Sequence, residues 1–479
     1  MMGQESFQLK SVEEMPFEIG ETYSELMGRK VVDKLNRLKK VQTIIGEVPE
    51  EMDAYLEAEM FIGRASEKLR VFEEYEDDLT KRIVDNYNMV DFGDYLYALH
   101  APERNEKLRN EFPERWDEDS SPSGMSDIEA ENIIKKYKGD KTIKKLAKEF
   151  KTNVIDKNLQ ALLDGEMITE EVYETLVNTY DNYVPLKGID TQEIFGGTGK
   201  GFSTQGKDIK RAYGRESRAK NPYVNSLVDF RTSIIRVEKN KVGQALYNLV
   251  LENPNDNYWK ASGLKYKPRY NQEGELEFMD PEKVGVHDFI VRVDGKIKKI
   301  VIKDPALLSG LKNLGAGVGI PVLQEINSYF RAVNTHLNPV FLLTNFTRDV
   351  QSAGIVLGGE HSKKIRNKVM KNIPSAMKGI WKSNRKKDPN EWSELYDNFK
   401  GVGGKMGWFD NLTLEQKVKQ LERKIKLSGK SGVKQVKAVG QFIEDVNDVV
   451  ESAVRLSTYK AMLDAGMTEK QSASVAKNL

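Results

Sequence analysis

Helical periodicity runs through most of this 479-residue chain and constrains its fold more than any other feature. Between residues 49 and 83, apolar side chains recur at the three- and four-residue spacing that places them on one face of a helix. The segment 221–251 repeats this pattern after Asn221-Pro222, and proline is well tolerated in the first turn of a helix. Further helical patterns with capping residues occur at about 91–109, 126–137, 140–164 and 169–182, and again beyond residue 321. The sequence therefore predicts a mainly α fold, built as an elongated multi-helix assembly.

One short segment, at about 284–302, has the sequence of a β-hairpin instead. The runs 289–293 and 296–302 are rich in β-branched residues, and they flank Asp294-Gly295. A two-residue Asp-Gly connection favours a type I′ turn, because both central residues of that turn need a positive φ. We therefore expect one small β-hairpin inside a helical chain.

The length of the chain indicates more than one domain, since a domain usually holds about 100 to 200 residues. The stretch from residue 187 to 214 contains seven glycines and no apolar periodicity, which is typical of a loop or linker. We expect four segments: an acidic helical module (1–186), a Gly/Lys-rich linker (187–220), a helix-plus-hairpin module (221–313) and a basic helical module (314–479). The last segment ends inside a helical pattern, so we expect a longer parent chain.

The composition excludes several classes of protein. Without a cysteine, the chain has no disulfide framework, no cysteine-ligated zinc and no thiol catalysis. Four scattered histidines are a poor basis for a metal site, and the glycines of 196–201 lack the spacing of a phosphate-binding loop. We expect no metal and no other cofactor. The N-terminus lacks the apolar core of a signal peptide, and no uncharged stretch approaches the roughly 20 residues of a transmembrane helix.

Charge is distributed unevenly, although the net charge is only +1. Residues 1–119 hold 16 basic and 29 acidic side chains, a net charge of −13. Residues 361–440 hold 20 basic and 7 acidic side chains, a net charge of +13. Such an asymmetry indicates that the basic end contacts either an anionic partner or the acidic part of the same chain, whereas differently charged solvated faces are the alternative.

The basic segment is the candidate for nucleic-acid contact, because lysine and arginine neutralise phosphates and a nearby tryptophan can stack on a base. The candidate residues are Lys363, Lys364, Arg366, Lys378, Trp381, Lys382, Arg385, Lys386 and Lys387. No motif for sequence-specific recognition accompanies them. Three interpretations stay open: non-specific binding of DNA or RNA phosphates, binding of an acidic protein face, and a solvated surface.

Two polar phrases are candidates for either a structural or a ligand-binding role. His100, Glu103 and Arg104 surround Pro102, and local spacing allows an acid/base pair, although a kinked helix whose polar groups hold a neighbour is the simpler interpretation. The second phrase contains Asn345, Arg348 and Asp349. We expect Arg348 to pair with an acidic residue, because buried polar groups require partners. An enzyme whose site lies near His100, Glu103 and Arg104 is the alternative.

Seven ordered phrases resemble a known family. They are Tyr97 to Asn105, Ser123 to Asp127, Tyr183 to Leu186, Arg211 to Pro222, Asn338 to Phe341, Asn345 to Asp349 and Asn447 to Leu456. In this order they are similar to the large polyvalent protein-associated domains of giant multidomain proteins from bacteriophages and mobile elements. The similarity extends from about residue 90 to the C-terminus, and its specificity lies in the order of the phrases.

The resemblance implies a non-catalytic helical scaffold and delivery module. In such proteins the module stands beside separate enzymatic domains of the same chain, and the whole protein is packaged with DNA and injected into the host. We therefore expect it in the virion and then in the host cytoplasm, with other domains of the same chain as partners. The family offers no catalytic residue that can be transferred to a position here.

Overall fold

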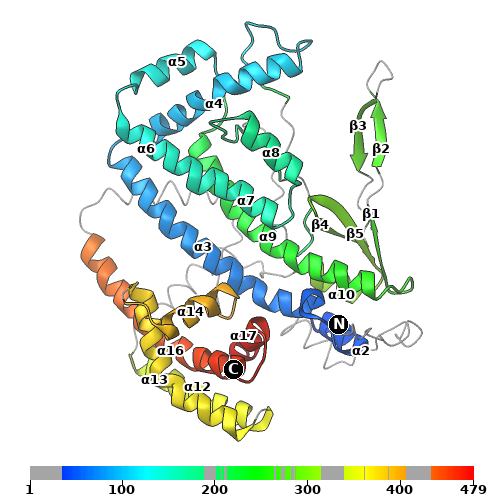
Figure 1. Ribbon diagram of the computed structural model, residues 1–479, viewed down its shortest axis with the longest axis vertical. Coiled ribbons are helices and arrows are strands. Elements are labelled where there is room, and N and C mark those ends of the chain that lie inside the picture. The colour runs from blue at the N-terminus through cyan, green and yellow to red at the C-terminus, as the bar shows by residue number, and fades with distance from the viewer. Residues whose placement is uncertain are drawn as a thin grey trace, which may run out of the picture. The chain divides into compact units, whose positions relative to one another are not determined.

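The computed structural model describes most of the chain (Figure 1). The described residues are 35–187, 201–205, 208–209, 213–263, 266–270, 276–281, 285, 287–313, 339–360, 362–386, 388–405 and 433–479. They form a mainly helical structure with a small antiparallel sheet, which confirms the predicted fold class. No helix among them is both long and apolar enough to cross a membrane.

The chain folds into two compact units. Unit 1 contains the described parts of residues 1–55 and 72–314, and unit 2 contains residues 56–71 with the described parts of 315–410 and 427–479. The predicted segments 1–186 and 221–313 thus share unit 1, apart from 16 residues of one helix that pack in unit 2. Much of the predicted linker, namely 188–200, 206–207 and 210–212, lies outside the described residues.

Most of the described helices belong to unit 1. They are α2 (Asn36–Ile45), the short 3-10 helix η2 (Glu50–Met52), the second part of α3 (Ala54–Val84), α4 (Met89–Glu111), α5 (Asp127–Lys136), α6 (Lys141–Phe150), the π-helix η3 (Lys151–Asp156), α7 (Lys157–Asp164), α8 (Glu170–Thr179), α9 (Pro222–Glu252) and α10 (Pro305–Lys312). Helices α5 and α8 begin at the usual side-chain caps, where Ser126 accepts the backbone N–H of Glu129 and Thr169 accepts that of Val172.

Helix α9 is the centre of unit 1 (Figure 1). It contacts α4, α7, η3 and two strands, and its buried residues lie on all sides of the helix. Several buried polar residues on it are bonded internally, as burial requires. Asn240, for example, is fully buried and receives the backbone N–H of Arg292 at 2.8 Å while its amide donates to Gly165 O at 3.1 Å.

The predicted hairpin is confirmed and is extended by a third strand. Strands β4 (Asp288–Val293) and β5 (Lys296–Ile302) are antiparallel, with Val293 opposite Lys296. Asp294 and Gly295 have φ of 50° and 69°, as a type I′ turn requires. Three strands were not anticipated: β1 (Trp259–Gly263) pairs with the other edge of β5, and β2 (Tyr266–Tyr270) pairs with β3 (Leu276–Pro281).

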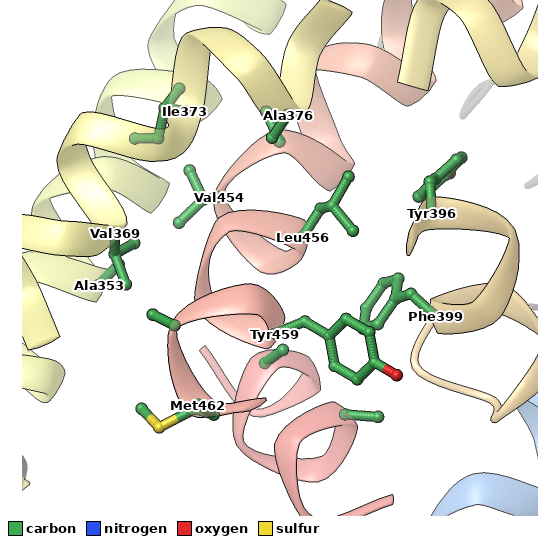
Figure 2. Close-up of a cluster of buried hydrophobic side chains, with 14 of the residues drawn as sticks. Ala353, Val369, Ile373, Ala376, Tyr396, Phe399, Val454, Leu456, Tyr459 and Met462 are labelled. Carbon is green, nitrogen blue, oxygen red and sulfur yellow. The ribbon is translucent and has the colours of Figure 1, made fainter. Parts of the chain in front are cut away.

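Unit 2 is a helical bundle organised around one long helix. Its helices are residues 56–71 of α3, α12 (Pro339–Glu360), α13 (Lys363–Arg385), α14 (Glu391–Gly401), α16 (Val433–Leu463) and α17 (Glu469–Lys477). Helix α16 contacts α12, α13, α14 and α17. Figure 2 shows its apolar side chains between α13 and α14, where Tyr459 meets Phe399 with ring centroids 5.1 Å apart.

Candidate functional site

The first polar phrase lies on α4, which continues through Pro102 from residue 89 to residue 111. His100 and Asn105 have no exposed surface, while Glu103 and Arg104 are half-buried. His100 and Arg104 are four residues apart, so they lie on the same face of the helix. The phrase therefore points into unit 1 rather than into open solvent.

Asn105 joins α4 to the phrase from Ser123 to Asp127. Its carbonyl accepts the backbone N–H of Ser123 at 2.8 Å, and its amide donates to Met125 O at 2.9 Å and to the Asp127 carboxylate at 2.7 Å. Ser126 in the same phrase caps α5. Because a buried amide with three partners is well satisfied, Asn105 has the geometry of a structural residue.

Tyr97 joins α4 to the phrase from Arg211 to Pro222 as well as to the phrase from Ser123 to Asp127. Its hydroxyl donates to Ser123 O at 2.6 Å and accepts from Ala219 N at 3.1 Å. The guanidinium of Arg218 lies over the Tyr97 ring, 5.6 Å from its centroid, and forms ion pairs with Asp94 and Glu129. Three phrases that are up to 122 residues apart in the sequence thus meet at one tyrosine.

The phrase from Tyr183 to Leu186 and the residues just before it cover His100. The Tyr180 and Tyr183 rings meet the imidazole edge to face, with centroids 4.9 and 5.6 Å away, and stack on each other at 5.9 Å. Asn182 between them donates to the Glu103 carboxylate from its backbone at 3.1 Å and from its amide at 2.7 Å. The four phrases before residue 223 therefore build one network in unit 1.

Burial and charge shape the ionisation of this network. Burial lowers the pKa of His100, so the imidazole is neutral near neutral pH. Burial acts to raise the pKa of Glu103, but its contacts with His100 and Asn182 outweigh that effect and lower it. The distance from His100 Nδ1 to Glu103 Oε2 is 3.7 Å, which is long for a hydrogen bond. Burial lowers the pKa of Arg104, and the charge of Arg215 acts in the same direction.

Sequence reasoning found His100, Glu103 and Arg104 but did not single out Tyr180, Asn182 or Arg215. All three lie inside or beside phrases of the family resemblance, which is the only signal they carry in the sequence. Asn182 and Glu103 are 79 residues apart, and nothing in their local spacing indicates contact. Their pairing is a property of the tertiary fold.

The second polar phrase, which contains Asn345, Arg348 and Asp349, belongs to α12 of unit 2. Arg348 is exposed on that helix, and the side chains of Asn345 and Asp349 lie outside the described residues. The pairing of Arg348 with an acidic residue stays a prediction. The two polar phrases therefore occupy different units.

Several basic side chains of the segment 361–440 have partners within unit 2. Lys368 pairs with Asp464 at 2.6 Å, Arg385 pairs with Asp445 at 2.8 Å, and Lys382 donates to a backbone carbonyl at 3.0 Å. Trp381 packs against the core of unit 2 and lies under the Arg385 guanidinium, whose carbon is 4.8 Å from the ring centroid. Hence core packing accounts for Trp381 without a stacked base.

Most other basic side chains of this segment are exposed. Lys363, Lys364, Lys371, Lys378 and Lys386 are exposed, Arg366 is half-buried, and the side chain of Lys387 lies outside the described residues. Lys364, Lys371 and Lys378, here called the lysine stripe, recur every seven residues and so share one face of the helix. None of the three forms an ion pair within the described structure. The opposite face, with Val369 and Ile373, is buried in the core.

Within the described residues, no group of three or more histidine, aspartate or glutamate side chains is placed to hold a metal ion. Comparisons with models of known protein families, with curated proteins and with solved structures each returned no match to this chain. The interpretation of the site therefore depends on its own geometry.

Proposed function

We propose that this chain is a non-catalytic helical scaffold and delivery module of a phage-encoded large polyvalent protein, packaged with DNA and injected into the host. The observation that supports this proposal is the convergence of four phrases of the family resemblance on one network in unit 1. Its central contacts, from Asn105 to residues 123–127 and from Tyr97 to residues 123 and 219, hold separate segments together. Such a network explains why these residue types occur in this order without requiring a reaction.

Catalysis at His100 is less well supported than architecture. The Glu103 carboxylate already accepts two bonds from Asn182, and the imidazole lies behind two tyrosine rings. A general base must reach the proton that it removes, at about 2.6–3.2 Å or through one water. A fully buried imidazole between aromatic rings does not present that geometry.

The composition of purified virions tests the proposal. Mass spectrometry of density-purified particles from the phage that encodes this chain should detect its peptides at a constant copy number per particle. An empty-capsid fraction from the same preparation serves as control, because a delivered protein leaves with the genome. Absence of the peptides from full particles would contradict the proposal.

A second candidate function, non-specific nucleic-acid binding through residues 361–440, is favoured by the lysine stripe. Consecutive lysines of the stripe lie about 10 Å apart along α13, given a rise of about 1.5 Å per residue. Three unneutralised cations in a row can contact several phosphates along a strand, and binding of that kind weakens steeply with salt. Lys417, Lys419, Arg423, Lys424 and Lys426, which add to the charge of this segment, lie outside the described residues.

Charge reversal on two helices distinguishes this binding from a general charge effect. Fluorescence anisotropy with short DNA and RNA at about 50 and 200 mM salt should show binding that falls by orders of magnitude over this range. Reversal of the lysine stripe to glutamate should abolish it. The control reverses Lys141, Lys145 and Lys148, which are exposed on α6 and give the same change of net charge. Equal loss in both variants, or no binding at low salt, would end this candidate.

A further inference from the structure

Two guanidinium groups of the His100 network have no carboxylate to neutralise them. Among the described residues, Arg104 forms neither a hydrogen bond nor an ion pair, and its Nε atom is buried without a partner. Arg215 donates only to neutral oxygens, at 2.7 Å to Ser217 O and at 2.8 Å to the Ser217 hydroxyl. Arg218, by contrast, pairs with both Asp94 and Glu129. The local excess of positive charge therefore belongs to Arg104 and Arg215.

Two tyrosines lie close to Arg104. The rings of Tyr180 and Tyr183 pack on His100, one helical turn before Arg104 on the same face of α4, and the charge of Arg215 acts to lower the pKa of Arg104. Neither hydroxyl forms a hydrogen bond within the part of the chain that the structure describes. Burial raises the pKa of Tyr183 to about 12, so its hydroxyl keeps its proton and acts as a donor at neutral pH.

The nearest carboxylate does not compensate this charge. Glu103 is held by two bonds from Asn182, and its other contact is with His100. His100 itself is fully buried, and neither of its ring nitrogens has a hydrogen-bond partner. An unpaired cation at a half-buried position and buried polar atoms without partners are costly, and native structures rarely retain them unless something else satisfies them.

We propose that Arg104, Arg215 and the hydroxyl groups of Tyr180 and Tyr183 bind the phosphate group of a phosphorylated ligand. A guanidinium presents parallel N–H donors that match two oxygens of a phosphate, and the phenolic hydroxyls supply two further donors. Two uncompensated positive charges fit a phosphate better than a carboxylate, which carries a single negative charge. Arg104 remains partly exposed, so a ligand can reach it.

The positions of these groups are fixed by the surrounding network. The backbone N–H of Arg215 donates to Pro122 O at 2.8 Å, and the indole of Trp116 donates to Tyr213 O at 2.9 Å. A Cβ atom on Gly214 would lie 2.6 Å from the Trp116 ring, so the loop packs closely at this point. The backbone of Arg215 is thereby held against the loop that follows α4, and bonds to Ser217 orient its guanidinium, as a preorganised anion site requires.

Isothermal titration calorimetry of the full chain tests the site. The ligands are inorganic phosphate, adenosine monophosphate and a short phosphodiester oligonucleotide, with acetate at matched ionic strength as comparison. We expect the phosphate ligands to bind, acetate not to bind, and Arg104→Gln to weaken binding at least about tenfold, since hydrogen bonds to charged groups are the strong ones. Relative affinities for the three phosphate ligands distinguish a free phosphate, a nucleotide and a nucleic-acid strand.

Two variants control for charge and for folding. Lys107→Gln removes an exposed positive charge three residues further along α4 and should leave binding unchanged. Tyr180→Phe keeps the ring and removes only the hydroxyl, so the fold is preserved and phosphate binding should weaken several-fold. In phosphate-free buffer, Arg104→Gln should keep or raise the melting temperature, because it removes an unpaired charge from a half-buried position.

Several results would overturn the site. They are the absence of phosphate binding to the wild-type chain, acetate binding as strong as phosphate binding, and equal weakening by Lys107→Gln and Arg104→Gln. A lower melting temperature of Arg104→Gln together with unchanged phosphate binding in Tyr180→Phe would show that both residues are only structural.

Discussion

At the scale of single residues, α4 carries satisfied and unsatisfied polar groups side by side. Asn105 has three hydrogen-bond partners, whereas Arg104 has none among the described residues. Both residues occur in one phrase, so their sequence context does not separate them. Their surroundings differ: residues 123–127 approach Asn105, whereas the groups that act most on the pKa of Arg104 besides burial are three tyrosines and Arg215.

Replacement of Asn105 by alanine should destabilise unit 1. The substitution leaves Ser123 N buried without its partner and removes one of the two hydrogen bonds to Met125 O, so we expect a loss of about 2–4 kcal/mol in the free energy of unfolding. Urea unfolding followed by circular dichroism measures it. Asn110→Ala, at an exposed position on the same helix, should change stability by less than about 0.5 kcal/mol. Equal stability of the two variants would contradict the structural role of Asn105.

Lys477 should make the stability of unit 2 depend on pH. Burial lowers the pKa of Lys477 to about 8, and Arg64 and Arg455 act in the same direction, although the ammonium group donates to Glu59 O at 2.6 Å. Between pH 8 and 10 the unfolded chain binds the proton more tightly than the folded chain. The contribution of this group to stability therefore rises with pH through that window.

The variant Lys477→Met isolates this contribution. It lacks the cost of a buried charge, so its stability relative to the wild type should be highest near pH 7 and should decline as the pH rises from about 8 to 10. Thermal melts of both chains across this range provide the measurement. A difference that does not vary with pH would show that the ammonium group is not penalised in the folded state.

At the scale of elements, helix positions follow from caps and periodicity, whereas isolated strands do not. The pattern from 221 to 251 corresponds to α9, and the Asp-Gly signal corresponds to the turn between β4 and β5. Strand β1 has the sequence Trp-Lys-Ala-Ser-Gly, with no alternation and little β-branching. It forms because β5 offers a free edge, and this tertiary cause leaves no mark on the local sequence.

Gly295→Ala should destabilise unit 1 through the hairpin turn. Gly295 has a φ of +69°, and a Cβ atom there would lie 2.2 Å from Thr169 N. Strain and steric overlap together predict a loss of about 2–4 kcal/mol in the free energy of unfolding. Gly139→Ala is the matched control, because a Cβ atom at that position meets nothing within 4 Å. Urea titration of both variants compares them, and similar midpoints would contradict the turn geometry.

At the scale of the whole molecule, the sequence shows which helices have an apolar face but not which of these helices pack against each other. Apolar periodicity from residue 49 to 83 predicts one helix, yet residues 56–71 of α3 pack in unit 2 and residues 72–84 pack in unit 1. The network of unit 1 likewise collects phrases from residues 97 to 219. The residue types of this network are visible in the sequence, whereas their convergence depends on the fold.

The proposal that this chain is packaged and delivered is best tested by asking whether it passes from particles into cells. Cells are infected with a phage whose genome carries the gene for this chain, while host protein synthesis is blocked, so that any copies of the chain in the cells were injected. Quantitative mass spectrometry of washed cytoplasm should then detect the chain at about the copy number found per particle. A chain that stays with the emptied capsids, or that appears only when synthesis is allowed, would contradict a delivered scaffold module.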